Sequence, residues 1–249
     1  MTLTDARTGQ YVKYHAGDVE LTAYLSQPAT PGTHPGMLIV QPVHGLTPHM
    51  EVVADRLAAQ GYVAFAPALY SPLGTITFDA SGAPPPEARE LQRQTSDSDV
   101  VKYLQAALTY MKSLDAIGDQ KIGGVGFCAG GRWGLFFAAE EPRLDAFVAF
   151  YPTVADVEPQ PHRPVLVWDV IHKIGCPVCV LFGDQDRAAT EEFRERLRGL
   201  LVEHEVDYEW HLYAGAGHGF ANEGSESYQD EPTRAAWVVA NDYIARKLR

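Results

Sequence analysis

The segment Gly-Phe-Cys-Ala-Gly at residues 126–130 constrains the fold of this chain more than any other. An apolar, strand-like run at 122–125 precedes it, and an apolar, helix-like run at 133–139 follows it. Glycines on both sides of a residue let two chain segments pass close together in a sharp strand-to-helix turn. This is the pattern of a nucleophile elbow with Cys128 as the nucleophile. Such a turn aims the sulfur at the start of a helix, where the dipole and free N–H groups favour a thiolate.

The rest of the chain alternates between short apolar runs and helical patterns. The pattern predicts an N-terminal antiparallel hairpin over 11–26 and further strands over 37–41, 62–66, 121–127, 146–151, 177–182 and 208–213. It predicts helices over 48–60, 87–114, 190–203 and 232–247, with one more from the elbow to just before Pro142. This alternation indicates an α/β fold with a mostly parallel sheet that helices cover on both faces. Because no repeat and no linker interrupt it, we expect residues 1–249 to form a single domain.

The net charge and the cysteine content limit the binding partners and the cellular location that we expect for this chain. The formal net charge is −12 at pH 7, which disfavours nucleic acid and anionic membranes because both are negatively charged. Three cysteines cannot form a closed disulfide framework, the N-terminus lacks the pattern of a signal peptide, and no apolar run is long enough to span a bilayer. We therefore expect a cytoplasmic protein, a monomer or small homo-oligomer, that acts on a small molecule.

A thiol nucleophile needs a base beside it, and the base needs a group that orients it. Asp184 and Asp186 lie in a turn directly after the apolar run at 177–182, and His218 lies between two glycines after the last strand. The carboxyl ends of parallel strands meet at one edge of a sheet, where ligands bind in such folds. Cysteine, acid and histidine also follow one another in an order known for catalytic triads. The sequence therefore predicts a triad of Cys128, His218 and one of the two aspartates.

Cys176 and Cys179 have the spacing of a redox or metal-binding pair. The pair lies at the start of a strand rather than of a helix, where redox pairs normally lie, and no second pair completes a zinc site. We therefore expect both cysteines to pack in the core.

Four blocks of the sequence carry a family resemblance: QPVHG at 41–45, GYVAFAPALY at 61–70, VGFCAGG at 125–131 and AGHGF at 216–220. With these blocks the chain resembles the dienelactone hydrolase (carboxymethylenebutenolidase) family of α/β-hydrolases from about residue 21 to the C-terminus. The resemblance implies the α/β-hydrolase fold and a triad of Cys128, Asp186 and His218. Asp186 is preferred to Asp184 because the acid of these hydrolases commonly lies three residues after the strand-ending glycine. The resemblance further implies an oxyanion hole from the backbone N–H groups of Val43 and Ala129.

One departure from the family concerns the resting thiol. The family usually has a glutamate after the glutamine of the first block, where it interacts with the thiol, and this chain has Pro42 there. Proline offers neither an acid nor an N–H group. Either Cys128 rests as an ion pair with His218, or the nearby His44 takes over part of the glutamate's role; as a bystander, His44 would only line the site.

A second departure concerns recognition of a substrate carboxylate, for which the family uses two arginines. Arg89 matches one of them, with Arg93 as a competitor and a solvated helix surface as the alternative for Arg89. The other is expected four residues after the catalytic histidine, where this chain has Asn222. Tyr151, at the end of a strand on the same edge, is a candidate pocket wall. The Gly-, Ser- and Pro-rich stretch at 74–86 predicts an exposed loop bordering the site.

A cysteine nucleophile favours substrates whose leaving group needs little protonation, such as the enolate of an enol-lactone ring. With an ordinary alkyl ester, the thiolate itself would be expelled from the tetrahedral intermediate. The sequence therefore predicts hydrolysis of an activated lactone such as dienelactone through a thioester, with no metal or cofactor. The alternative is a broader carboxylesterase or thioesterase with the same triad, which Pro42 and Asn222 favour. A non-catalytic thiol sensor or binding protein would have no need of the ordered acid and histidine segments.

Overall fold

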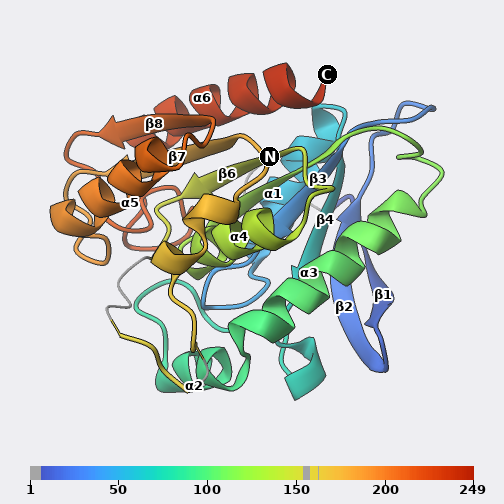
Figure 1. Ribbon diagram of the computed structural model, residues 1–249. Coiled ribbons are helices and arrows are strands. Elements are labelled where there is room, and N and C mark those ends of the chain that lie inside the picture. The colour runs from blue at the N-terminus through green and yellow to red at the C-terminus, as the bar shows by residue number, and fades with distance from the viewer. Residues whose placement is uncertain (1–6, 154–157, 162) are drawn as a thin grey trace.

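An eight-stranded sheet forms the centre of the computed structural model, which describes residues 7–153, 158–161 and 163–249 (Figure 1). The strands lie in the order β1-β2-β4-β3-β5-β6-β7-β8. Their bounds are β1 Gln10–Ala16, β2 Val19–Ser26, β3 Gly36–Val40, β4 Val63–Ala68, β5 Ile122–Phe127, β6 Ala146–Phe150, β7 Val178–Gly183 and β8 Tyr208–Tyr213. β2 pairs antiparallel with β1 and β4, and the other neighbours are parallel. The predicted N-terminal hairpin and mostly parallel sheet are confirmed.

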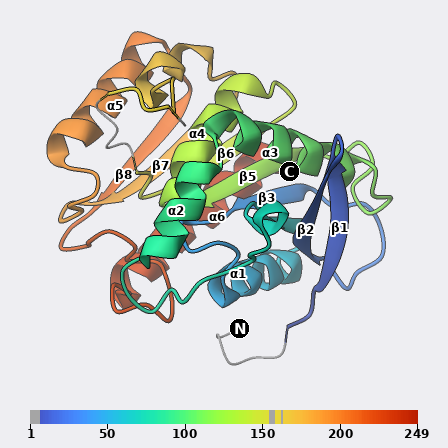
Figure 2. The same cartoon turned by 90° about the horizontal axis from the view of Figure 1, so that it is seen from below.

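Helices cover both faces of this sheet. Helices α3, α4 and α5 lie on one face and α1 and α6 on the other (Figures 1 and 2). The helices are α1 Pro48–Ala59, α2 Pro86–Gln94, α3 Asp97–Lys112, α4 Ala129–Glu140, α5 Glu191–Glu203 and α6 Asp230–Leu248, with 3-10 turns η1 Ser71–Leu73, η2 Val167–Asp169 and η3 Ile171–Lys173. Every residue of β3 to β7 is buried, as expected for parallel strands covered on both faces.

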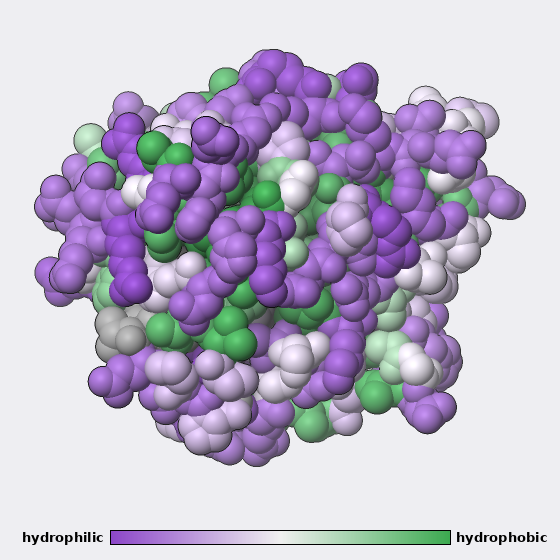
Figure 3. Space-filling model, in the orientation of Figure 1, coloured by the Kyte–Doolittle hydropathy of each residue, from purple (hydrophilic) through white to green (hydrophobic). Residues whose placement is uncertain are grey.

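The outer surface is mainly hydrophilic. Polar and charged residues cover most of the face seen in Figure 3, and hydrophobic ones lie between them in scattered areas. Within the described residues, no helix combines the length and the apolar character needed to cross a membrane.

The single long helix predicted over 87–114 is wrong, because Thr95 and Ser96 divide it into α2 and α3. The Oγ of Ser96 accepts a hydrogen bond from the N–H of Asp99 at 3.1 Å and donates one to the Asp99 carboxylate at 2.7 Å. This is an N-cap that starts a new helix. The break lets α2 leave the line of α3 and reach the carboxyl edge of the sheet (Figure 2).

A buried ion pair joins the first turns of α3 and α4. The two carboxylate oxygens of Asp97 accept hydrogen bonds from Arg132 Nη1 at 2.6 Å and Nη2 at 2.8 Å, and Trp133 Nε1 donates to the same carboxylate at 3.0 Å. The Arg132 and Asp97 side chains are only 3% and 9% exposed. Because α4 begins directly after Cys128, this pair anchors the helix that carries the predicted nucleophile at its N-terminus.

Candidate active site

Cys128 occupies the sharp turn between β5 and α4, with φ 56° and ψ −117°. Residues with a side chain rarely adopt a positive φ, and the strain persists only where the surroundings enforce it. A Cβ on Gly126 would lie 2.2 Å from the carbonyl oxygen of Gly130, and one on Gly130 would lie 2.1 Å from that of Val40. Both glycines are therefore required by the close approach of the turn to itself and to β3, as their pattern predicts.

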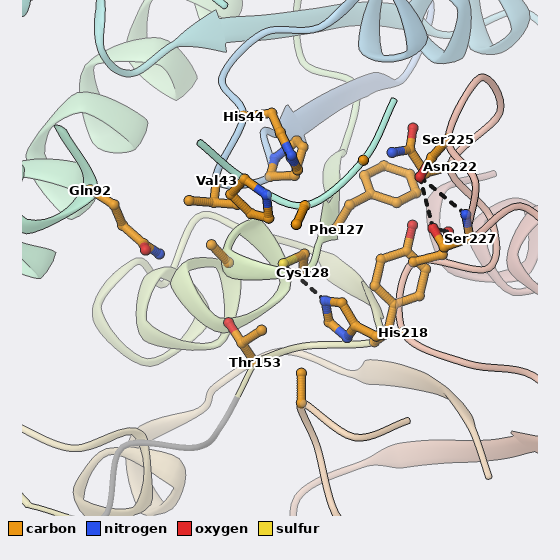
Figure 4. A pocket seen from close by; sticks show the side chains of 18 of the residues that line it. Val43, His44, Gln92, Phe127, Cys128, Thr153, His218, Asn222, Ser225 and Ser227 are labelled. Atoms are coloured by element: carbon orange, nitrogen blue, oxygen red, sulfur yellow. Dashed lines mark hydrogen bonds between the residues drawn. The ribbon is translucent and has the colours of Figure 1, made fainter. Parts of the chain in front are cut away.

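His218 lies between Cys128 and Asp186 and contacts both. Its Nε2 is 3.1 Å from Cys128 Sγ, and its Nδ1 is 2.9 Å from Asp186 Oδ2 (Figure 4 shows the first contact). The other Asp186 oxygen accepts hydrogen bonds from the N–H groups of Ala188 and Ala189 at 2.8 and 3.0 Å. The structure thus brings together three residues from the ends of β5, β7 and β8, in the geometry of a nucleophile, an oriented base and its orienting acid.

Asp184, the other candidate acid, makes no hydrogen bond to His218 and instead stabilises the turn after β8. Its Oδ1 accepts the N–H of Gly215 at 2.7 Å and so links the ends of β7 and β8. The buried Arg194 of α5 donates to the carbonyl oxygens of Ala189 at 2.6 Å and Asp184 at 3.3 Å, which braces the loop that carries Asp186. Acidic and basic residues alternate along α5 as on an exposed helix, so the sequence could not indicate this buried role.

Opposing effects set the protonation of Cys128 and His218. Burial raises the pKa of Cys128, but the charge and hydrogen bond of His218 and the N–H of Ala129 outweigh it, so the pKa is lowered overall. Burial lowers the pKa of His218, but the charge of Cys128 and the hydrogen bonds to Asp186 and Cys128 raise it to about 10. Each group favours the charged form of the other, which supports a resting thiolate–imidazolium pair.

This charge pair predicts the pH dependence of Cys128 alkylation. As the pH falls through the lowered pKa of Cys128, the thiolate is protonated and the rate should fall; as the pH rises through about 10, His218 loses its proton and the thiolate remains. His218→Gln removes the positive charge that favours the thiolate, so alkylation by iodoacetamide at neutral pH should be about tenfold slower or more. Mass spectrometry should find one adduct, because burial raises the pKa of Cys176 and Cys179 to about 12. An unchanged pH profile in His218→Gln would contradict the ion pair.

Val43 and Ala129 both line the pocket at Cys128. Ala129 is the first residue of α4, where N–H groups have no partner within the helix. The Val43 loop is held in a tight turn, in which the N–H of Gly45 donates to the carbonyl of Pro42 at 3.0 Å. Gly45 has φ +88°, and a Cβ there would lie 2.4 Å from the carbonyl oxygen of Ile76. Within the described residues no carbonyl accepts the N–H of Val43 or Ala129, and the N–H of Ala129 contacts the Cys128 sulfur.

A cavity of about 480 Å³ opens above the Cys128 sulfur. Its lining includes all four residues that the sequence analysis proposes for substrate binding, Arg89, Tyr151, His44 and Asn222. Figure 4 shows Val43 and His44 on one side of Cys128, and Asn222 with Ser225 and Ser227 on another. The predicted loop at 74–86 contributes residues 82–84 to the lining.

The four residues differ in their surroundings. Tyr151 is buried, with its ring edge-on to that of His218 at 5.2 Å between centroids, so it supports the imidazole. His44 is 7% exposed, burial lowers its pKa, and within the described residues it makes no hydrogen bond to Cys128. It therefore contributes a neutral wall rather than a partner for the thiol. Arg89 is exposed on α2, and Asn222 is half-buried.

Arg163 is the cationic pocket residue that the sequence analysis missed. It lies half-buried between β6 and η2, where Gln160 and Arg163 exchange backbone hydrogen bonds of 2.9 and 2.8 Å. With Arg89 it gives this acidic protein two guanidinium groups in the pocket lining. The segment has no strand or helix periodicity, so its position at the pocket could not be predicted.

Comparisons with known proteins identify the family of the chain. The family model described as "Dienelactone hydrolase family" matches residues 21–248. A Synechocystis sp. protein named "Putative carboxymethylenebutenolidase" is 29% identical over 235 residues, covering 93% of this chain and 94% of that protein. A Bradyrhizobium protein named "Probable 2-oxo-3-(5-oxofuran-2-ylidene)propanoate lactonase" is 28% identical over 216 residues, covering 86% and 85%. The crystal structure of a "Putative Dienelactone Hydrolase" from Klebsiella pneumoniae matches with a TM-score of 0.85 and 25% identity, covering 97% of this chain and 100% of that chain.

Proposed function

The chain belongs to the dienelactone hydrolase family and is a hydrolase, and from this premise we propose that it opens an activated enol-lactone with a Cys128–His218–Asp186 triad. The observation that carries the proposal is the position of His218, which contacts Cys128 Sγ at 3.1 Å and Asp186 at 2.9 Å through opposite ring nitrogens. The lowered pKa of the Cys128 thiol supports a nucleophile that is ionised before substrate binds.

In the proposed reaction, the Cys128 thiolate attacks the lactone carbonyl, and the N–H groups of Val43 and Ala129 stabilise the negative oxygen. The ring C–O bond then breaks, leaving a thioester on Cys128 and an enolate that takes the proton of the His218 imidazolium. Neutral His218 next removes a proton from water, which attacks the thioester. Collapse of the second tetrahedral intermediate releases the carboxylic acid and restores the thiolate–imidazolium pair. Asp186 orients the ring and stabilises its charged form throughout.

The leaving group selects the substrate class. An enolate is a far weaker base than an alkoxide, so it leaves an enol-lactone intermediate in preference to the thiolate. The name of the Bradyrhizobium relative describes a furanone with an ylidene side chain and a carboxylate, which is a substrate of this class. The two arginines of the pocket lining support a substrate that carries such a carboxylate.

The proposed function is tested by turnover of cis- and trans-dienelactone, followed by ultraviolet absorbance. The comparison substrates are a saturated five-membered lactone and p-nitrophenyl acetate. We expect fast opening of at least one dienelactone isomer and little reaction of the saturated lactone. Fast p-nitrophenyl acetate hydrolysis without dienelactone turnover would instead establish the broader esterase, which the neutral Asn222 at the pocket favours. Stoichiometric thiol labelling without turnover of any ester would refute both and leave a thiol sensor or binding protein.

The carboxylate contact is tested by Arg163→Gln and Arg89→Gln. Each is expected to raise KM for a carboxylate-bearing enol-lactone by about ten- to a hundredfold with a smaller change in kcat, because a charge-assisted hydrogen bond is lost. The neutral methyl ester of the same lactone should be unaffected. Arg93→Gln is the matched control, because Arg93 pairs with Glu90 on the exposed side of α2 and does not line the pocket. An equal effect of all three variants would exclude a specific contact.

A further inference from the structure

A second group of chemically reactive side chains lies on the face of the sheet that α6 covers. In the parallel pair β7 and β8, Cys179 is the register partner of Glu209, and His211 follows two residues later. Residues two apart in a strand share a face, and the register places Cys179 beside them. The Cys179 sulfur, a carboxylate oxygen of Glu209 and a ring nitrogen of His211 all lie within 4.8 Å of one another.

Unpartnered polar atoms surround this group. The Nε2 of His211 is buried and lies 3.7 Å from a Glu209 carboxylate oxygen, and it makes no hydrogen bond to any residue that the structure describes. The hydroxyl groups of Tyr213 and Tyr243 are also buried and have no hydrogen-bond partner in the described part of the chain. Both lie close enough to Cys179 for its charge to raise their pKa. Buried polar atoms in folded proteins nearly always have a partner, so these three can serve a bound ion and the water on it.

We propose that Cys179, Glu209 and His211 bind a divalent transition-metal ion, with zinc as the best match to the three donors. Thiolate sulfur, imidazole nitrogen and carboxylate oxygen together suit zinc, whereas calcium and magnesium prefer oxygen alone. Zinc–ligand bonds of about 2.0–2.3 Å place tetrahedral donor atoms about 3.3–3.8 Å apart, within reach of small side-chain rotations from the spacing here. Three protein ligands leave the fourth position to water, which the Tyr213 and Tyr243 hydroxyls can hydrogen-bond. On binding, the Cys179 thiol loses its proton to solvent.

Arg246 of α6 is the present partner of Glu209. Its Nη2 lies 2.9 and 3.1 Å from the two Glu209 oxygens, while its Nε donates to Asp242 at 2.8 Å. Arg246 and Glu209 are 46% and 33% exposed, and pairs this exposed contribute little to stability. Because Arg246 keeps Asp242 when Glu209 turns toward a metal, the exchange of partners costs little.

The spacing of these residues in the sequence does not reveal the site, because the register of β7 and β8 brings them together and no sequence motif contains all three. The Cys-Pro-Val-Cys sequence suggests that Cys176 and Cys179 act together, yet Cys176 precedes β7 and is not one of the three clustered donors. Both thiols are buried, and burial raises the pKa of both to about 12. Cys176 is therefore a matched control for Cys179.

The test is Co²⁺ titration of the full chain carrying Cys128→Ser, which removes the thiol of the catalytic site. We expect one equivalent of Co²⁺ to bind with a thiolate-to-cobalt charge-transfer band and the visible bands of tetrahedral cobalt, and Zn²⁺ to displace it. Adding Cys179→Ser should abolish the charge-transfer band, and Cys176→Ser should leave it intact. His211→Gln and Glu209→Gln should each weaken binding about tenfold or more, as loss of a ligand does.

Three results would overturn the site: no charge-transfer band, a band that survives Cys179→Ser, or binding that is unchanged in both His211→Gln and Glu209→Gln. Because His211 and Glu209 are half-exposed, their variants decide the question even if Cys179→Ser fails to fold, which far-ultraviolet circular dichroism would show. None of these readouts depends on lactone hydrolysis.

Discussion

Replacing Cys128 by alanine is expected to lower kcat/KM for an enol-lactone by about 10⁴-fold or more, with the protein still folded. Without the sulfur the proposed thioester cannot form, and only the proposed oxyanion hole and substrate binding continue to lower the barrier. Asp186→Asn should also be severe, because the amide can present an N–H to His218 Nδ1 and so favour the wrong tautomer of the ring. The measurement is steady-state turnover of the most reactive lactone isomer, with circular dichroism to verify folding.

In the proposed mechanism the triad members act on one another, so the effects of their substitutions should not add. The double variant Cys128→Ala/Asp186→Asn is expected to be no slower than Cys128→Ala alone, because Asp186 acts through His218 on a nucleophile that is already lost. Asp184→Asn is the matched control: Asp184 lies two residues away and serves the Gly215 turn, and an amide oxygen can still accept that hydrogen bond. Near-normal turnover in Cys128→Ala would contradict the proposed mechanism. So would a loss of turnover in Asp184→Asn equal to that in Asp186→Asn.

The largest expected effect on stability comes from the ion pair between Asp97 and Arg132. Asp97→Ala should lower the free energy of unfolding by about 3–5 kcal/mol, because it leaves a buried guanidinium without its counter-ion. Trp133 Nε1 also loses its acceptor. The measurement is urea unfolding followed by tryptophan fluorescence, with thermal unfolding as a second probe.

The matched control for this pair is Asp230→Ala in α6. Its salt bridge with Arg234 is similarly short, at 2.7 Å, but the two side chains are 59% and 74% exposed. Removing it should change stability by less than about 1 kcal/mol. Equal losses of stability in Asp97→Ala and Asp230→Ala would show that burial does not increase the cost of breaking a salt bridge. The double variant Asp97→Leu/Arg132→Met should recover much of the loss, because no unpaired charge then remains buried.

Local glycine geometry made much of the fold and site predictable. The glycines on both sides of Cys128 and His218 indicate the turns in which these side chains lie. The alternation of strands and helices predicts that both turns lie at the same edge of the sheet. The break before α3 carried a local signal too, the pairing of Ser96 with Asp99, but the continuous polar pattern on both sides concealed it. A local sequence pattern does not predict the position of a side chain when a contact between distant segments determines it.

Three residues show that limit. Arg163 reaches the pocket from an irregular segment, Arg194 turns inward from a helix whose charge pattern is that of an exposed one, and Cys179 meets Glu209 only through strand register. Each position depends on how distant segments pack, which neither periodicity nor motif spacing records.

The division of α2 from α3 has a consequence for how this protein can evolve. The reactive thiol is set in a turn where even one added methyl group at Gly126 or Gly130 would collide with backbone. Arg89 and Gln92, by contrast, stand on a short helix that the break at Thr95 and Ser96 separates from the helices packed on the sheet. Substitutions in α2 can therefore alter which substrates this hydrolase accepts while the elbow stays intact. New substrate ranges should arise first in this helix and last in the elbow.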